Sequence, residues 1–191
     1  MKSSNSLIAL ACGTIFLSAC AATGKPIQPV GGVDLSRYMG RWYVIASIPT
    51  PFERGGVNAV ETYSRNTDGT VCTWFRMRPE SFTAPVKLLH SSARIVESTG
   101  NGEWQVRVFK VFRAQYLIGW LKADYSEVLV VRDARDYLWY MARTPEVSDE
   151  SYQAMVDRSR VLGYDVSRIE KVPQLWPESG NGSDTFKEDC K

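Results

Sequence analysis

The stretch EVLVVRDARDYLWYMAR, residues 127–143, predicts two antiparallel strands joined by a turn. Its two runs, Glu127–Arg132 and Tyr137–Arg143, are rich in the β-branched and aromatic residues that favour strands. The connection Asp133–Asp136 is short and polar, as turns usually are. We therefore expect a β-hairpin in this part of the chain.

Six more runs of the same kind precede this hairpin, at spacings near ten residues. Short strands at such spacings, separated by Gly, Asn and Asp, favour an antiparallel barrel or sandwich. An eight-stranded barrel has room for about one small ligand, and its closure removes exposed sheet edges. The six runs are Arg41–Ile48, Val57–Ser64, Thr70–Arg78, Val86–Val96, Trp104–Val111 and Tyr116–Ala123.

One amphipathic helix is expected after the hairpin. Ser148 suits its N-cap, Asp149 and Glu150 suit its positive first turn, and Gly163 suits the position after its last turn. Its apolar face predicts packing against the outside of a sheet. The predicted fold class is all-β: an eight-stranded antiparallel up-and-down β-barrel with one C-terminal α-helix packed outside.

The composition of the 191 residues narrows the function classes. The 23 Lys and Arg residues nearly balance the 21 Asp and Glu residues, which argues against a partner made of nucleic acid. The length and the 44% hydrophobic content fit one folded domain and argue against disorder. Aromatic residues make up 12% of the chain and include 6 Trp, so they are the leading candidates for core and ligand contacts.

The N-terminus predicts an exported protein. Lys2 is followed by the apolar run Leu7–Leu17, which is too short to span a bilayer and is typical of a signal peptide. The tetrapeptide Leu17-Ser18-Ala19-Cys20 resembles the lipobox of bacterial lipoproteins. An ordinary signal peptide with an incidental cysteine is the alternative.

The lipobox resemblance implies a membrane anchor. Residues 1–19 would be a lipoprotein signal peptide, Cys20 would be acylated, and residues 20–32 would form a lipidated tether. Ala21 stands where retention in the inner membrane would usually show Asp, so we expect the protein at the outer membrane, with its barrel facing the periplasm.

Residues of common catalytic and metal sites are scarce. His90 is the only histidine, so a His-rich metal site is excluded and a Ser-His-Asp triad would have to use it. The sequence holds no Gly-x-Ser-x-Gly elbow, phosphate-binding loop or Cys-x-x-Cys pair. We therefore expect a protein that is not an enzyme, without metal or cofactor, and a surface position for His90.

Three motifs in order resemble the lipocalin family: Gly40-Arg41-Trp42 at the first strand, Asp124-Tyr125 in a late turn, and Arg143 at the end of the last strand. The stretch Phe52-Glu53-Arg54-Gly55 and the lipobox resemble more narrowly the bacterial outer-membrane lipoprotein lipocalins, which are related to apolipoprotein D. We expect the barrel domain over residues 33–176 and a flexible tail over residues 177–191.

The resemblance implies that the protein binds, stores or transports lipids in its barrel. Fatty acids, lysophospholipids or similar apolar molecules would be its ligands, and the protein would be a monomer or a weak homodimer. Two alternatives stay open: an envelope lipoprotein with a filled barrel that acts through its surface, and a lipocalin-fold enzyme.

The motif residues have structural roles in this family, which implies that Gly40, Trp42, Asp124, Tyr125 and Arg143 shape the barrel here. Trp42 would fill the closed end, with the guanidinium of Arg143 stacked over its ring. If Trp42 points inward, simple alternation also turns Val44 and Ala46 inward.

Strand alternation and the family's register predict the cavity wall. An inward carboxylate at Glu61 needs a partner or a water path, unless the register of its strand is shifted by one residue. The alternative is that these aromatic side chains simply fill the barrel. The predicted wall consists of Tyr63, Phe75, Trp104, Ile118, Trp120 and Trp139.

Two cysteines, Cys72 and Cys190, remain after the N-terminal pair is set aside. Export exposes them to oxidising conditions, and many animal lipocalins attach their tail to the barrel by a disulfide. A Cys72–Cys190 bridge is therefore expected, and two free thiols are the alternative.

Overall fold

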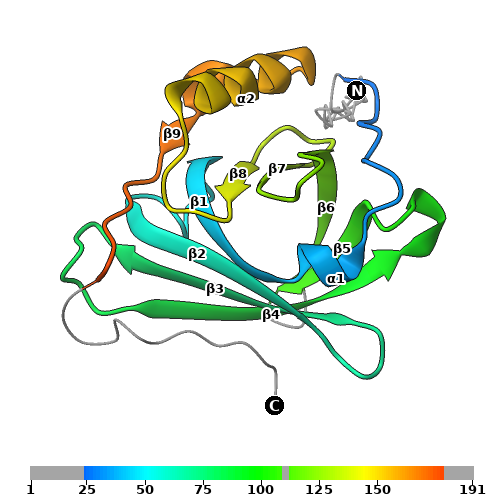
Figure 1. Ribbon diagram of the computed structural model, residues 1–191, viewed down its shortest axis with the longest axis horizontal. Coiled ribbons are helices and arrows are strands. Elements are labelled where there is room, and N and C mark those ends of the chain that lie inside the picture. Colours follow the sequence, from blue (N-terminus) through cyan, green and yellow to red (C-terminus); the bar gives the residue numbers. More distant parts are fainter. Residues whose placement is uncertain (1–23, 109–111, 179–191) are drawn as a thin grey trace, which may run out of the picture.

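The computed structural model describes residues 24–108 and 112–178, and its strands form one closed antiparallel barrel (Figure 1). Each strand from β1 to β8 pairs with the next, and β1 also pairs with β8, which confirms the predicted eight-stranded barrel. A two-residue strand, β9, adds to β1. The strands are β1 (Gly40–Ile48), β2 (Gly56–Arg65), β3 (Val71–Pro79), β4 (Lys87–Val96), β5 (Glu103–Val108), β6 (Phe112–Leu121), β7 (Glu127–Val131), β8 (Leu138–Ala142) and β9 (Glu170–Lys171).

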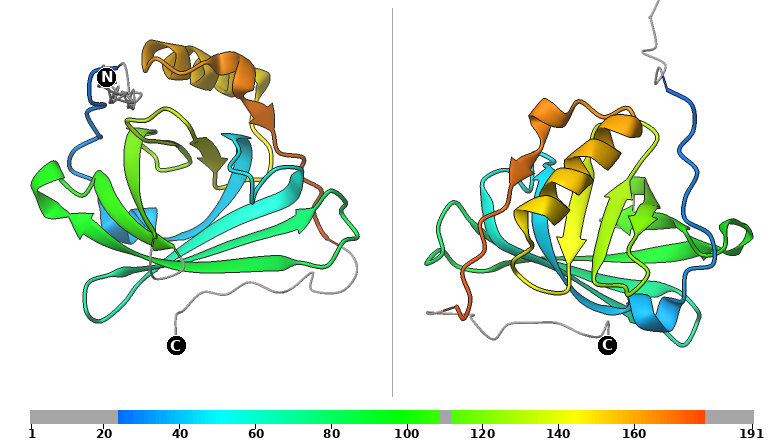
Figure 2. Two further views of the ribbon diagram at one scale, coloured as in Figure 1. Left: turned by 180° about the vertical axis from the view of Figure 1, so that it is seen from behind. Right: turned by 45° about the horizontal axis from the view of Figure 1, so that its top comes forward.

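The helices are α1 (Leu35–Tyr38) and α2 (Asp149–Val161), with 3₁₀ turns at Glu97–Thr99 and Val166–Arg168. The hydroxyl of Ser148 accepts a hydrogen bond from the backbone N–H of Ser151 at the start of α2. Gly163 follows its end with a φ of 86°, a left-handed conformation that glycine adopts without strain. The predicted helix and both of its end signals are confirmed, and α2 lies outside the barrel (Figure 2).

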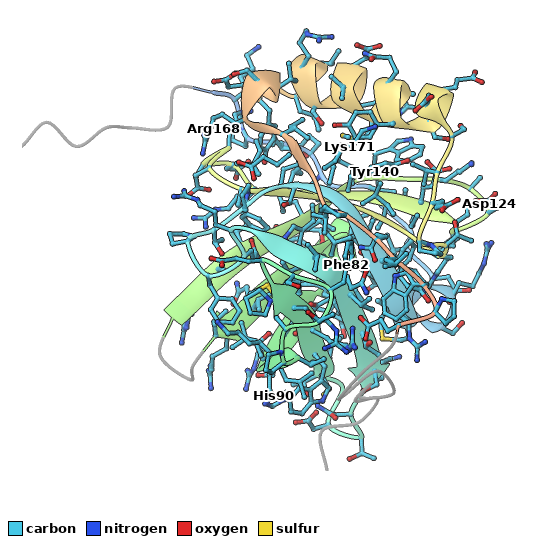
Figure 3. The ribbon with its side chains drawn as sticks, turned by 90° about the vertical axis from the view of Figure 1, so that its left-hand side faces the viewer. Phe82, His90, Asp124, Tyr140, Arg168 and Lys171 are labelled. Carbon is cyan, nitrogen blue, oxygen red and sulfur yellow. The ribbon has the colours of Figure 1, made fainter. Side chains whose placement is uncertain are left out.

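Buried apolar side chains form two layers, one inside the barrel and one between the barrel and α2. Trp42, Val44 and Met141 belong to the inner layer, whereas Ala46, Tyr140 and Met155 belong to the outer layer. Figure 3 shows Tyr140 beneath α2 and His90 on the far side of the barrel. The strands β1, β6, β7 and β8 therefore bury apolar side chains on both of their faces.

One end of the barrel is closed by α1 and the start of β1. The Trp42 indole N–H donates to the carbonyl of Tyr38 at 2.8 Å, and the Arg143 guanidinium lies 3.7 Å above the Trp42 ring. The same guanidinium donates to the carbonyls of Arg37, Tyr38, Met39 and Arg41, at 2.7–3.0 Å. This closed end is called the floor below.

The remaining motif residues also lie at this end. Gly40 has a φ of 90°, a left-handed conformation that favours glycine. Asp124 accepts from the backbone N–H of Ser126 at 2.9 Å, and the hydroxyl of Tyr125 accepts from the N–H of Asp34 at 2.8 Å. The turn between β6 and β7 is therefore connected to the segment that leads into α1.

The segment before α1 runs along the outside of the barrel toward its other end (Figure 2). The N–H of Val30 donates to the carbonyl of Ile118 on β6. Nearer its start, the N–H of Ile27 donates to the Asp133 carboxylate at 2.7 Å, and Arg135 donates to the carbonyl of Lys25 at 2.8 Å. Asp133 and Arg135 lie between β7 and β8, so the segment reaches the loops opposite the floor.

The chain after β9 crosses the outer face of β2 and β3. The Glu178 carboxylate forms ion pairs with Arg76 and Arg78, and it accepts from the Asn58 amide at 2.7 Å. These contacts lower the pKa of Glu178 to about 2, although its burial opposes them. Glu178 falls within the tail expected to be flexible, and it is held on the barrel.

Candidate functional site

A cavity of about 280 Å³ occupies the half of the barrel interior opposite the floor. The β1–β2 loop (residues 49–55) and the β7–β8 loop (residues 132–137) contribute to its rim, which is called the mouth below. Its size is near the lower end of the range for small-ligand sites. The lining is Thr50, Phe52, Glu53, Glu61, Tyr63, Thr73, Phe75, Leu89, Ser91, Val106, Val108, Ala114, Tyr116, Arg132, Tyr137 and Trp139.

Three residues of the predicted wall, Tyr63, Phe75 and Trp139, line this cavity. The rings of Phe75 and Trp139 stack with their centroids 5.5 Å apart. Tyr137 packs edge-on against Trp139 at 5.7 Å. Aromatic rings from β3, from β8 and from the residue before β8 therefore give this side of the cavity a mostly apolar surface.

Trp104 and Ile118 also point into the barrel, but they lie in the packed core below the cavity. Both side chains are fully buried in the inner layer, and neither lines the cavity. The Trp104 ring stacks on Tyr116 at 4.8 Å and meets Tyr63 edge-on at 5.4 Å. Their predicted inward direction agrees with the structure, but their side chains are not part of the cavity lining.

Trp120 lies outside the barrel, contrary to the predicted wall. It packs against the outer layer, and the guanidinium of Arg158 on α2 lies 4.5 Å above its ring. The pairing of β6 with β7 is irregular between Ile118 and Trp120, as expected for a β-bulge. The extra residue reverses the alternation, so Ile118 and Trp120 point to opposite faces.

The bottom of the cavity is formed by tyrosines whose hydroxyl groups are paired with one another. The Tyr116 hydroxyl lies 2.6 Å from that of Tyr38 and 2.7 Å from that of Tyr63. Burial raises the pKa of all three phenols. They are therefore neutral across the physiological pH range, and they form a continuous polar contact inside the packed floor.

Glu61 points into the barrel, which settles the register of β2. It pairs across the sheet with Trp42 on β1 and with Phe75 on β3, and its exposed fraction is 3%. Burial raises the pKa of its carboxyl group to about 8; a hydrogen bond with Thr73 opposes this rise, and the charge of Glu53 adds to it. The Oε2 atom has no hydrogen-bond partner among the described residues.

Several cavity residues were not among those predicted, including Glu53 in the β1–β2 loop. Its Oε2 atom accepts from the backbone N–H of Thr50 at 2.8 Å, and burial raises the pKa of its carboxyl group. Loop residues carry no alternation, so only the Phe52-Glu53-Arg54-Gly55 resemblance pointed to this segment. Leu89 and Ser91 of β4 were also left out of the predicted wall, although the outward position expected for His90 turns both of its neighbours inward.

The histidine that a catalytic triad would need does not lie at the cavity. His90 is exposed on the outer face, with its ring 4.6 Å from Trp74, as expected for a surface histidine. Within residues 24–108 and 112–178, no three His, Cys, Asp or Glu side chains are grouped to hold a metal ion. No helix in the same ranges is long and apolar enough to cross a membrane.

Two expectations fall on residues outside those described. Cys20 and the rest of residues 1–23 are among them, and so is Cys190. Cys72 is a fully buried residue of β3. The acylation of Cys20 and the Cys72–Cys190 bridge therefore stay predictions.

Comparison with protein families finds a lipocalin-like domain over residues 33–174. The outer membrane lipoprotein Blc of Escherichia coli K12 is 31% identical over 173 residues, which cover 88% of this chain and 96% of that protein. Temperature-induced lipocalin-1 of Arabidopsis thaliana is 30% identical over 187 residues, covering 87% and 92% of the two chains.

Solved structures agree with this fold at lower sequence identity. Insecticyanin from the tobacco hornworm Manduca sexta aligns with a TM-score of 0.61 at 14% identity, covering 81% of this chain and 89% of that one. At that identity the alignment supports the architecture alone.

Proposed function

Since the chain belongs to the lipocalin family, we propose that it is an outer-membrane lipoprotein that binds small apolar ligands in its barrel. Its ligands would be fatty acids, lysophospholipids or similar apolar molecules. The family and its fold are typical of binding and transport proteins. The relatives named as outer membrane lipoproteins support the location.

The observation that carries this proposal is the cavity between the floor and the mouth. Its walls are mainly apolar, and burial of apolar ligand surface contributes about 25 cal/mol per Å². A volume of about 280 Å³ suits a short hydrocarbon segment rather than a whole phospholipid. The headgroup of a lysophospholipid would therefore remain outside the mouth.

The path of the N-terminal segment supports uptake from a membrane. Lys25 and Ile27 are bound to Arg135 and Asp133 beside the mouth. Gly24 is four positions after Cys20, so a lipid anchor at Cys20 would be held within about 14 Å of that end, at about 3.5 Å per residue. An acylated Cys20 would thus keep the mouth, rather than the floor, near the membrane surface.

Saturable binding of a fluorescent fatty acid to the purified protein tests the proposal. Trp139→Glu places a charge in the cavity wall and is expected to weaken binding at least tenfold. Trp74→Glu, which makes the same change on the outer face of β3, is the matched control and should bind within twofold of the parent. Equal binding by both variants, or no saturable binding by the parent, would contradict the proposal.

The packed floor is the feature that favours the alternative of a filled, structural barrel. Native mass spectrometry of protein extracted gently from its host separates the two functions, because a lipid carrier should retain a bound ligand. The same spectra report whether the protein is a monomer or a weak homodimer. Protein that carries no lipid would favour the structural role.

A disulfide between Cys72 and Cys190 is part of the same proposal for an exported protein. Counting free thiols in denaturant, with and without reductant, tests it. No titratable thiol from this pair is expected before reduction and two after it. Two thiols in the unreduced protein would show that the bridge is absent.

A further inference from the structure

Two buried polar atoms of the cavity lining have no hydrogen-bond partner among the described residues: Oε2 of Glu61, next to the floor, and Nε of Arg132, at the mouth. The carboxyl group of Glu61 is almost fully buried next to Trp42 and Phe75. A buried polar group without a partner costs folding free energy, so the retention of such a group calls for an explanation. The position of Glu61 on the cavity wall makes a ligand the natural partner.

A second carboxyl group, from Glu53, lines the same cavity. Its negative charge contributes to the raised pKa of Glu61, which places the two groups within electrostatic reach of each other. Its Oε2 atom bonds to the backbone N–H of Thr50, which orients the group without neutralising its charge. The lower interior and the mouth therefore both carry acidic groups.

Positive charge is scarce among the cavity residues. Among the described lining residues, Arg132 is the only Lys, Arg or His, and its Nε atom lies 3.1 Å from the Asp136 carboxylate. Its guanidinium also lies 5.9 Å from the Tyr137 ring centroid. The Asp136 carboxylate therefore offsets the charge of Arg132 near the mouth, although its Nε atom makes no hydrogen bond, and the described part of the lining supplies no other cation to the buried acid.

The rings around the acids favour the same sign of charge in a ligand. Phe75, Tyr137 and Trp139 line the cavity, and the faces of aromatic rings attract cations. A fatty acid would have to place its carboxylate near the mouth and press its hydrocarbon tail on Glu61, which leaves Oε2 unpaired. An ammonium group at the inner end of a ligand would instead satisfy Oε2 and gain from the rings.

We propose that the cavity selects lipophilic amines, whose protonated amino group enters first and binds Glu61, with Glu53 and the aromatic wall contributing to the attraction. This inference rests on the proposed function, because it assumes that the cavity binds apolar molecules, and it narrows their class. Since the empty site holds the Glu61 proton up to a pH of about 8, binding of an ammonium group near pH 7 releases that proton to solvent.

Competition with a fluorescent apolar probe at pH 7 tests the selection, using decylamine, decanol and decanoate. These ligands share one hydrocarbon chain, so their differences report the polar end. Decylamine is expected to bind at least tenfold more tightly than decanol, and decanoate more weakly than decanol. Calorimetry in two buffers of different ionisation enthalpy should show proton release with decylamine alone.

Glu61→Gln tests the assigned residue, since it keeps the shape and removes the charge. It should weaken decylamine about tenfold and leave decanol within twofold. Glu127→Gln is the matched control, because Glu127 is also a buried glutamate but lies in the outer layer, where it bonds Tyr140 and Lys122. It should change none of the three affinities.

The outcomes separate this inference from the proposed function. Equal affinities of the parent protein for decylamine and decanol would overturn the inference and leave apolar binding intact, and this measurement needs no variant to fold. An unchanged decylamine affinity in folded Glu61→Gln would also overturn it. Failure of all three ligands to displace the probe, or of the probe to bind, would overturn the proposed function as well.

Discussion

The two halves of the barrel interior use aromatic residues in opposite ways. In the floor, the ring of Tyr38 packs against those of Trp42 and Trp104 with centroids 5.2 and 5.3 Å away, and all three side chains are fully buried. Around the cavity, Phe75 and Trp139 stack on each other and leave a hollow beside them. The aromatic residues of the chain therefore fill one half of the barrel and line a cavity in the other.

Polar groups differ between the halves in the same way. Each tyrosine hydroxyl of the floor has a partner 2.6 or 2.7 Å away, whereas one oxygen of Glu61 has no hydrogen-bond partner among the residues that the structure describes. A buried polar network in which every group is hydrogen-bonded stabilises the fold, whereas a buried group without a partner can gain free energy by binding a ligand. Substitutions in the floor should therefore change stability, and substitutions at the cavity should change binding.

Trp42→Ala should have the largest effect. It removes a fully buried ring together with the surface on which Arg143 stacks, so the free energy of unfolding should fall by about 3–5 kcal/mol. Urea denaturation measures this change. A loss below 1 kcal/mol would contradict the assignment of the floor as the stabilising half.

Glu61→Gln should change how the free energy of unfolding depends on pH, through the buried carboxyl group that it removes from the cavity. Because the folded-state pKa of Glu61 is raised to about 8, the unfolded chain loses this proton at lower pH, and the parent protein loses stability between about pH 4.5 and 8. The variant lacks this penalty. Its stability relative to the parent should therefore rise by about 3–4 kcal/mol from pH 5 to pH 8, at about 1.4 kcal/mol per pKa unit.

Urea denaturation of both proteins at the two pH values checks this difference. A gain that is the same at pH 5 and pH 8 would show that Glu61 does not hold its proton in the folded state.

Tyr116→Phe should have a smaller effect, confined to the floor. It removes the hydroxyl that joins Tyr38 and Tyr63, and it should lower the free energy of unfolding by about 1–2 kcal/mol. Tyr152→Phe, on the half-exposed face of α2, is the control and should be nearly neutral. Equal effects of the two changes in thermal or urea unfolding would argue against a structural role for the hydroxyl chain.

Phe52→Ala should have the smallest effect on stability. Phe52 lines the cavity at the mouth and is 42% exposed, so its loss should change the free energy of unfolding by less than about 0.5 kcal/mol. Probe binding should weaken a few-fold, because apolar contact area is lost. A large stability loss without a binding change would reverse the comparison between the two halves.

Much of the fold could be predicted from the sequence because it depends on local signals. Strand-forming runs, the Ser148 cap and Gly163 act over a few residues, and their elements appear as predicted. The motif residues Trp42 and Arg143 also meet as the family resemblance implied.

The wrong predictions of inward side chains fall where the inward–outward alternation of a strand is interrupted. Bulge-like shifts between Val44 and Ala46 and between Ile118 and Trp120 reverse the inward face of β1 and β6. Gly119 is a sequence signal for the irregularity in β6, because glycine within a strand often marks a bulge. In the structure, a side chain at this position would meet Val131. No residue of β1 gives such a signal.

A second kind of error concerns depth. Alternation states which face of a strand a residue occupies, but not how far along the barrel axis it lies. Trp104 and Trp139 both point inward, and only Trp139 reaches the cavity. The position of the floor depends on how Tyr38, Tyr63 and Tyr116 pack together, which is a tertiary property.

The packed floor limits the length of ligand hydrocarbon chain that can enter the barrel. Each methylene group that enters contributes about 0.8 kcal/mol of binding free energy until the chain end meets the tyrosines, and further groups remain beyond the mouth. Across a homologous series the affinity should therefore rise steeply and then level off. A long-chain ligand would be held by one end only, with its remainder still dissolved in the surrounding lipid, so that release requires the withdrawal of a short segment.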